Sequence, residues 1–468
     1  MLVVAGAALS GPMLDAATNP LAASTRRRAR TGGSPAKDSG YGSIAPRRPA
    51  SVVGVDESIE WLALPDGFKY AILGVAGTPM SDGNVTPYGH DGMGAFQGRR
   101  GRVRLVRNHE VRDGAGSVSP LSATNAYDAL AGGGTTTLEI GFDRDGIPGV
   151  VRDFVSLSGT HTNCAGGVTP WKSWLSCEET TAGSPDFGES HGYVFDVPAA
   201  SNGPVDPVPL RALGRFAHEA ACVDPQTGIV YETEDTGNAG FYRYVPDRPV
   251  RNRQPDFEAG RLQMLKVTDV DNYDGGTGQE PGRALDAEWV DIDEPDPPSG
   301  GTAVYDEGIS KGAAAFRKLE GCTFADGVAY FVSTSGGDAS QGQVWAYEPR
   351  GRSRGRLTLV FEVPEATVMS RPDNVVMSPR GALLLCEDTF HVLPGNTAAE
   401  QHLRGLTVDG AAFDFAANLV DSGEWAGACW SPDGKYLFAN TLGSTVRSDT
   451  APPSRTYAIW GPWSRGAL

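Results

Sequence analysis

The feature that most constrains the fold of this 468-residue chain is a strand-like segment that occurs six times. Each copy begins near a turn, continues through four or five residues that favour strands, and ends on polar residues. The copies are, in order, GRVRLVRNHE, TPWKSWLSCEET, TGIVYETEDT, DGVAYFVSTS, RGALLLCEDT and DGKYLFANT. Such self-similarity predicts six copies of one structural unit between residues 100 and 442.

Further strand-like segments surround each copy. A short apolar segment precedes it, often across a turn containing Pro, Asp or Gly, and a third and usually a fourth segment follow. We therefore predict an all-β fold, a six-bladed β-propeller with four antiparallel strands per blade. The sixth unit lacks a fourth strand, and FKYAILG near residue 70 has no unit of its own, so we expect this N-terminal strand to close the ring.

Changes in amino-acid composition along the sequence divide the chain into a leader and one domain. Residues 20–52 contain RRRAR and no apolar period, and an apolar start precedes them, so we expect residues 1–52 to be a disordered leader or the remnant of an export signal. Residues 53–468 are expected to form a single propeller domain. A stretch at about 250–310, rich in Asp, Gly and Pro, is predicted to be a loop insertion.

The net charge, the apolar start and the cysteine content indicate which partners and cross-links to expect. The formal net charge of −17 repels a phosphate backbone, so we expect no nucleic-acid partner, and cations are the more natural ligands. The apolar start is too short to span a bilayer, so no membrane partner is expected. Six cysteines are too few for a disulfide scaffold in a chain of this length, and most are expected to be small buried apolar residues.

Acidic residues recur at positions that a propeller would bring together, because the first strand of each blade starts, and the second ends, on one face. Crowded carboxylates repel one another unless cations neutralise them, which predicts hard ions such as calcium or iron(III). Cys177 is either a thiolate ligand for iron at the rim of this cluster or a buried structural thiol. The predicted metal ligands are Asp91, Glu110, Cys177, Glu178, Glu179, Glu219, Glu234, Asp235, Glu320, Asp373, Glu387 and Asp388.

Several of these segments together resemble the PhoX family of alkaline phosphatases. They are LVRNHE, NCAGGVTPWKSWLSCEE, HGYVFDV, GRFAHEAACVDPQTGIVYETED and FYRYVP, and the likeness runs from about Pro87 to Trp463. The resemblance implies a six-bladed propeller, exported folded by the twin-arginine route to the cell envelope or the medium. It also implies a cluster of iron and calcium that binds phosphate oxygens and supplies an oxygen nucleophile. On this likeness Cys177 is the thiolate ligand, and Glu219, Glu320 and the acids of TED and CED are carboxylate ligands.

One motif departs from the family. Where long members have Arg-Pro-Glu, this chain has Lys318, Leu319 and Glu320, preceded by Arg317. We expect Lys318 or Arg317 to stabilise the charge of a pentavalent phosphoryl group and Asn163 to orient the phosphate. Lysine binds phosphate as a point charge and not through a bidentate fork, so the exchange is expected to weaken catalysis or change the substrate.

The sequence thus predicts a metal-dependent phosphatase acting on small phosphate esters as a monomer. Two alternatives stay open on the residues alone. One is a calcium-dependent lactonase or esterase, which needs one metal and a general acid or base. The other is a non-catalytic binding propeller stiffened by a structural calcium.

Overall fold

The computed structural model describes residues 40–390 and 400–468. Strands dominate it, and the all-β prediction is confirmed. Residues 1–39 of the expected leader lie outside the described residues, but the remainder of that segment is part of the fold. The short strand β1 (Ala45–Arg47) pairs with β2 (Leu62–Leu64), and Tyr41 packs edge-on against Phe68. The folded domain therefore starts earlier than expected.

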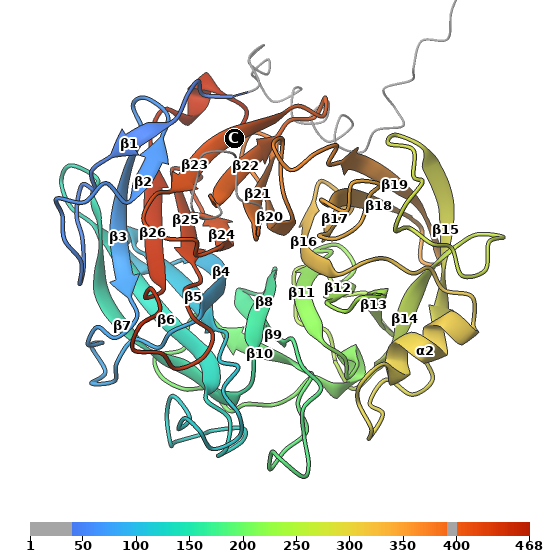
Figure 1. Ribbon diagram of the computed structural model, residues 1–468. Helices are drawn as coiled ribbons and strands as arrows, with labels where there is room; N and C mark the ends of the chain where they lie inside the picture. The colour runs from blue at the N-terminus through green and yellow to red at the C-terminus, as the bar shows by residue number, and fades with distance from the viewer. Residues whose placement is uncertain (1–39, 391–399) are drawn as a thin grey trace, which may run out of the picture.

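The strands form five hydrogen-bonded sheets, arranged radially around a common centre (Figure 1). The first two sheets along the chain are antiparallel. The first has four strands, β4 (His90–Gln97), β5 (Val103–His109), β6 (Gly133–Phe142) and β7 (Pro148–Thr160). The second has three strands, β8 (Asn163–Val168), β9 (Ser173–Glu178) and β10 (Val194–Pro198).

The third sheet has nine strands because two four-stranded units share an additional strand. The first unit contains β11 (His218–Val223), β12 (Val230–Glu234), β13 (Phe241–Pro246) and β14 (Gly260–Val267). The second contains β16 (Leu319–Ala325), β17 (Val328–Ser333), β18 (Gln343–Arg350) and β19 (Arg354–Glu362). Strand β15 (Ala284–Asp291) pairs with β14 on one side and with β19 on the other.

The segment at about 250–310 is therefore more than the predicted loop. It holds β14, β15 and the helix α2 (Ala303–Ser310), and β15 joins two units edge to edge. The alternation in ALDAEWVD is a strand pattern, but Asp, Gly and Pro on both sides obscured it. Pairing both outer edges to β15 leaves neither exposed.

The last two sheets include strands from both ends of the chain. One contains β20 (Pro372–Met377), β21 (Leu383–Glu387), β22 (His402–Leu406) and β23 (Ala412–Asn418), followed by β2 and β1. The other contains β24 (Trp425–Trp430), β25 (Tyr436–Thr441), β26 (Arg455–Trp460) and β3 (Lys69–Val75). Strand β3 includes most of the FKYAILG segment and pairs antiparallel with β26, so an N-terminal strand does complete the sixth unit.

The strands nearest the centre are β4, β8, β11, β16, β20 and β24 (Figure 1). Each contacts the next in this order, and β24 contacts β4, so the contacts close a ring. Small residues permit this approach. A Cβ on Gly92 of β4 would lie 2.6 Å from the Cα of Ala165 on β8, and one on Gly427 of β24 would lie 2.3 Å from the carbonyl oxygen of Asp91.

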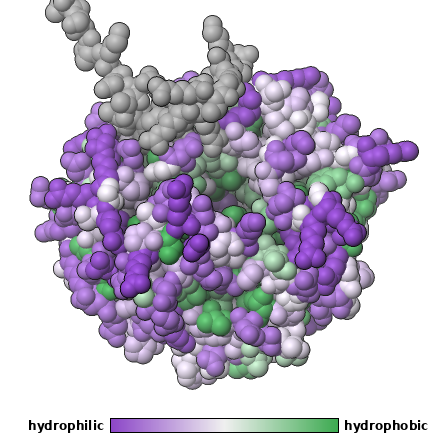
Figure 2. Space-filling view, turned by 180° about the vertical axis from the view of Figure 1, so that it is seen from behind, coloured by the Kyte–Doolittle hydropathy of each residue, from purple (hydrophilic) through white to green (hydrophobic). Residues whose placement is uncertain are grey.

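Apolar side chains fill the spaces between neighbouring units. Tyr231 and Phe241 pack with Phe331 and Trp345 between the two halves of the nine-stranded sheet. Such clusters of large buried side chains fix the units relative to one another. On one face of the molecule, polar residues cover the periphery and apolar residues gather around a hollow near the middle (Figure 2). No helix in the described part of the chain is long and apolar enough to cross a membrane.

Candidate metal centre

A cavity of about 290 Å³ lies where the inner strands begin and the second strands end. Carboxylates, one thiol and two basic side chains line it, and Leu442, Gly443 and Thr445 complete its wall. The ionisable lining residues are Glu110, Arg112, Cys164, Glu179, Glu219, Asp235, Lys318, Glu320, Asp373, Asp388 and Glu424. Eight carboxylates from distant parts of the chain thus share one cavity.

The inner strands each carry a β-bulge near their start. In five of them the pairing register with the second strand shifts just after the first residue, as between His90 and Met93 on β4, and in β24 it shifts one residue later, after Ala426. The second residue of five of these strands belongs to the acidic cluster. These residues are Asp91, Cys164, Glu219, Glu320 and Asp373. The sixth strand has Ala426 there, and Glu424, just before β24, lines the cavity instead.

The second strands supply the other carboxylates from the residue that follows the strand. Strands β5, β9, β12 and β21 end at His109, Glu178, Glu234 and Glu387. The next residues line the cavity, and they are Glu110, Glu179, Asp235 and Asp388. A single position of the repeat therefore provides one carboxylate in each of four units.

The acids that end the second strands have a different environment. Glu178 is fully buried and accepts hydrogen bonds from the backbone N–H groups of His161, Gly192 and Tyr193. Its Oε1 also lies 2.7 Å from His191 Nδ1. With its oxygens engaged by these donors, Glu178 ties the strand end to the next loop and is not free for a cation.

Glu387 and one oxygen of Glu234 are also engaged by donors, although Glu234 Oε1 has no hydrogen-bond partner among the described residues. Glu234 accepts from the N–H of Gly240 and the hydroxyl of Tyr242, each at 2.9 Å. Glu387 accepts from the N–H of Ser370 and from Arg404 Nε, and neither acid lines the cavity. The structure thus gathers Asp91, Glu110, Glu179, Glu219, Asp235, Glu320, Asp373 and Asp388 from the predicted ligands, and it leaves Glu178, Glu234 and Glu387 in the surrounding framework.

Cys177, the predicted thiolate, also lies outside the cavity. It belongs to an apolar cluster with Leu175, Val194 and Leu213, and burial raises the pKa of its thiol well above the usual value. The cavity thiol is Cys164 of the same motif, the second residue of β8. The bulge in β8 explains the correction, because one extra residue in a strand changes which side chains face the axis.

Candidate ligand atoms lie close enough to share cations. Three groups of side chains have ligand atoms within 4.8 Å of one another. The groups are Asp91 with Glu110 and Cys164, Cys164 with Glu179 and Glu219, and Glu219 with Glu320 and Asp373. Successive groups share Cys164 and then Glu219, so the arrangement can hold several cations side by side.

The buried carboxylates of the cavity would be stabilised by additional positive charge. Both carboxylate oxygens of Glu219 are buried without a hydrogen-bond partner among the described residues, as is Asp235 Oδ1. Burial first, and then the nearby Glu320 and Asp373 carboxylates, raise the pKa of Glu219 well above its usual value. Burial, followed by the Asp388 carboxylate, raises the pKa of Asp373 to about 8. Unpaired buried oxygens and crowded acids fit bound divalent or trivalent cations.

Two basic side chains accompany the acids. Lys318 Nζ lies 3.2 Å from Asp235 Oδ2 and 3.4 Å from Glu320 Oε1, and its side chain remains 39% exposed. Arg112 forms ion pairs with both Glu110 and Glu179. The backbone of Lys318 adopts a φ of +44°, an unusual conformation for a residue with a side chain. Backbone hydrogen bonds to Thr236 and Thr334 hold it there, so Lys318 has a fixed place at the cavity.

The other two predicted catalytic residues do not line this cavity. Arg317 pairs through Nη2 with Asp274 Oδ2 at 2.7 Å, so its guanidinium is directed toward the 269–276 loop. Asn163 is fully buried, where it accepts from the Thr160 hydroxyl and donates to the Ser176 hydroxyl. Only Lys318 of the three lines the cavity.

Of the ionisable residues that line the cavity, Cys164, Glu424 and Arg112 are absent from the predicted ligands and catalytic residues. For Cys164 a usable signal exists, because aligning the inner strands on their second residue places it in one column with Asp91, Glu219, Glu320 and Asp373. Glu424 and Arg112 lie outside strands and belong to no repeated column.

Comparison with known proteins identifies the family. The family model described as alkaline phosphatase PhoX matches residues 41–442, which is most of the chain. This chain belongs to the alkaline phosphatase PhoX family. As a PhoX family member it is a metal-dependent phosphatase, which decides against the lactonase and the binding propeller that the sequence left open. No curated protein sequence matches the chain significantly.

One solved structure has a similar fold. The structure of Pseudomonas fluorescens PhoX in complex with vanadate, a transition-state analogue, is similar with a TM-score of 0.66 and 17% identity, covering 92% of this chain and 99% of that one. Two structures of putative 6-phosphogluconolactonases are less similar. The one from Bacteroides uniformis has a TM-score of 0.31 and 12% identity, covering 75% and 84% of the chains. The one from Bacteroides fragilis has a TM-score of 0.32 and 13% identity, covering 74% and 75%.

Proposed function

We propose that the acidic cavity hydrolyses phosphate esters at a multinuclear centre of calcium and iron. The observation that carries this proposal is the unpaired Glu219 carboxylate, buried among other acids on the ring axis. Glu178, inside the framework, receives hydrogen-bond donors. Glu232 also lacks donors on both oxygens, but it lies outside the cavity with His218 Nδ1 3.3 Å from its Oε2. A carboxylate without donors in this setting is explained by bound cations.

The donor types suggest how two metals would divide the site. Glu219, Glu320 and Asp373 offer oxygen alone, which suits calcium. Cys164 adds a thiolate to two of the groups, and a thiolate beside carboxylates suits iron better than calcium. Metal binding would also require Cys164 to lose its proton, against the burial that raises the pKa of its thiol well above normal.

Bound cations would neutralise the phosphoryl oxygens and acidify a water molecule. The chain itself supplies the remaining functions. Lys318, partly exposed at the cavity, would donate to a phosphoryl oxygen as negative charge develops in the transition state. Arg112, held by Glu110 and Glu179, would be a second cation at the cavity. That Pseudomonas fluorescens PhoX binds vanadate, a transition-state analogue, supports a site of this kind.

The finer description of the fold is part of the same proposal. We interpret the five sheets as six blades, with β15 joining the third blade to the fourth and β3 completing the sixth. The closed ring of contacts among the six inner strands supports this interpretation. We also propose that the enzyme acts as an exported monomer on small phosphate esters, with no nucleic-acid partner, which agrees with its charge of −17.

Metal analysis joined to an activity assay tests the proposal. Purified protein is expected to contain both iron and calcium, together above one equivalent, and to release phosphate from p-nitrophenyl phosphate. Chelation should abolish hydrolysis, and readdition of both metals should restore it. A single calcium per chain with no phosphate release would contradict the proposal.

A further inference from the structure

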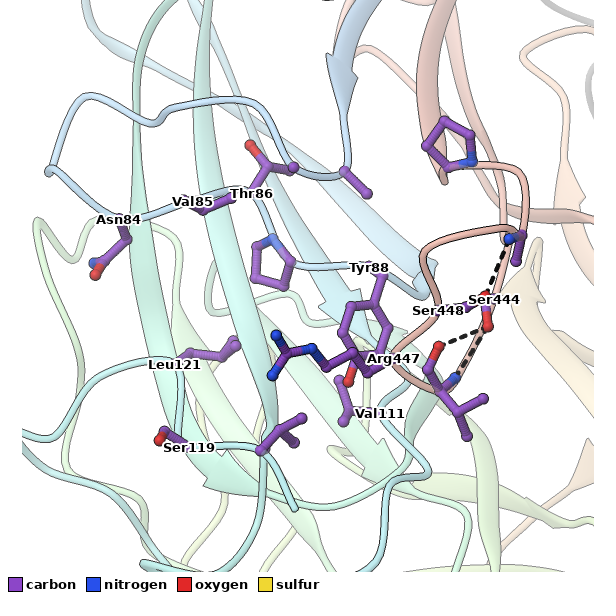
Figure 3. A pocket seen from close by; sticks show the side chains of 18 of the residues that line it. Asn84, Val85, Thr86, Tyr88, Val111, Ser119, Leu121, Ser444, Arg447 and Ser448 are labelled. Carbon is purple, nitrogen blue, oxygen red and sulfur yellow. Dashed lines mark hydrogen bonds between the residues drawn. The ribbon is translucent and has the colours of Figure 1, made fainter. Parts of the chain in front are cut away.

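A second, larger cavity lies beside the acidic one. It has a volume of about 570 Å³, within the range of small-molecule sites. Loops on three sides form it, covering residues 76–88, 111–132 and 444–453. Most of its lining is apolar, with Val, Leu and Pro side chains around Tyr88 (Figure 3).

The two cavities share a wall one backbone thick. The N–H of Arg112 donates to the carbonyl oxygen of Thr445 at 2.8 Å, which joins the two segments of the wall. Along these segments the lining residues alternate. Glu110, Arg112, Gly443 and Thr445 line the acidic cavity, whereas Val111, Ser444 and Val446 line the apolar one.

Arg447 is the one basic residue among those lining the apolar cavity. Figure 3 shows its guanidinium extending into the space between Leu121 and Tyr88. Asp113, the acid beside it, accepts instead from the Tyr88 hydroxyl and from the backbone N–H of Arg447. Among the described residues, no carboxylate lies within ion-pair distance of the Arg447 guanidinium. The cation is therefore free to pair with a ligand.

We propose that this cavity binds the leaving group of the substrate and selects phosphate esters of apolar, aromatic alcohols that carry an anionic group. This inference rests on the proposed phosphatase site. The hydrogen bond between Arg112 and Thr445 closes the wall itself, but its edge at Arg112 is exposed to solvent. With the phosphoryl group among the acids, the leaving group passes over this edge, its ring packs against Val85 and Tyr88, and its anion pairs with Arg447. An aromatic ring fits an apolar lining, and a guanidinium pairs with a carboxylate through two parallel hydrogen bonds.

Four substrates separate the contributions of this subsite. They are glycerol phosphate, phenyl phosphate, 4-carboxyphenyl phosphate and the methyl ester of the last, assayed with metal-loaded enzyme. The neutral methyl ester withdraws electrons at least as strongly as the carboxylate, so intrinsic reactivity does not favour the anionic substrate. We expect kcat/KM to be at least about fivefold higher for 4-carboxyphenyl phosphate than for its methyl ester, the value of one partly exposed ion pair.

Two variants and an inhibitor assign this preference to the cavity. Arg447→Gln should remove the preference for the anionic ester, whereas Arg144→Gln, at an exposed arginine in a distant turn, should leave it intact. Val85→Trp should fill the cavity and lower the kcat/KM ratio of phenyl phosphate to glycerol phosphate. Free 4-hydroxybenzoate should inhibit glycerol phosphate hydrolysis competitively in the wild type, and less strongly in Arg447→Gln.

The outcomes distinguish this inference from the proposed function. If the metal-loaded enzyme releases phosphate from none of the four esters, the proposed function fails and the subsite with it. If all four are hydrolysed but neither variant changes the ratios and 4-hydroxybenzoate does not inhibit, the subsite alone is overturned.

Discussion

Glu178 and Glu179 are neighbours in sequence, yet their carboxylates serve different parts of the structure. Glu178 accepts hydrogen bonds from backbone N–H groups and His191 inside the framework, whereas Glu179 reaches the acidic cavity and pairs with Arg112. The same division separates Glu234 from Asp235 and Glu387 from Asp388. The first acid of each pair therefore stabilises the fold, and the second is available for metal.

This division predicts opposite effects for two matched substitutions. Glu178→Gln replaces an acceptor by an amide whose N–H groups face other donors, so we expect a loss of about 3 kcal/mol in the free energy of unfolding. Glu179→Gln should change stability much less but lower metal content and reduce kcat/KM by at least about 10²-fold. Urea unfolding and metal analysis of both variants check this. Equal loss of stability in both would contradict the division.

The two cysteines of the family motif form a second matched pair. Cys164→Ser should lose iron and most activity, because a serine hydroxyl is a poor substitute for a thiolate ligand. Cys177→Ser should retain metal but unfold more easily, by about 1–3 kcal/mol, since it buries a hydroxyl in an apolar cluster. Iron content and thermal unfolding of each variant give the answer. Loss of iron from Cys177→Ser but not from Cys164→Ser would instead support Cys177 as the thiolate ligand, as the sequence predicted.

Variants of Lys318 and Arg317 test whether the first is catalytic and the second structural. Lys318→Gln should reduce kcat by about 10²–10³-fold, the loss found when one donor to a developing oxyanion is removed. Lys318→Arg should recover part of the rate. Arg317→Gln should change kcat by less than about threefold, because its guanidinium pairs with Asp274 away from the cavity. A larger loss in Arg317→Gln than in Lys318→Gln would refute this assignment.

The crowded acids make the stability of the metal-free protein depend on pH. Burial and the neighbouring Asp388 raise the pKa of Asp373 from 3.8 to about 8, so the folded state holds a proton that the unfolded state releases near pH 4. The stability from this group is complete below pH 4 and is lost as the pH rises through about 8. We expect the Tm of chelated protein to fall over this range, and Asp373→Asn to flatten the fall.

Added metal provides the control for that measurement. Cations compensate the ionised carboxylates, so the metal-loaded protein should show a much weaker decline and the difference in Tm between the two forms should widen with pH. A difference that stays constant from pH 5 to pH 8 would show that the acids are not the metal site.

The repeat of strand-like segments was enough to predict the all-β class, the order of the hairpins and the use of an N-terminal strand beside β26. It also predicted most of the acids that line the cavity, because the ends of strands are visible in the sequence as polar residues after apolar runs. The additional strand β15 was missed because residues rich in Asp, Gly and Pro surround its short alternating pattern, and its pairing with β14 and β19 appears only in the tertiary structure.

The sequence by itself determined which chemical groups recur at the strand ends, and the tertiary structure alone decided which of them face the axis. Alternation with a period of two orients side chains only within an uninterrupted strand. The bulge at the start of each inner strand changes that alternation, so Cys164 enters the cavity while Cys177 packs in the core. Arg317 and Lys318 are also neighbours whose side chains take different directions, and only Lys318 lines the cavity. The positive φ of Lys318 depends on backbone hydrogen bonds to Thr236 and Thr334, which no local sequence pattern encodes.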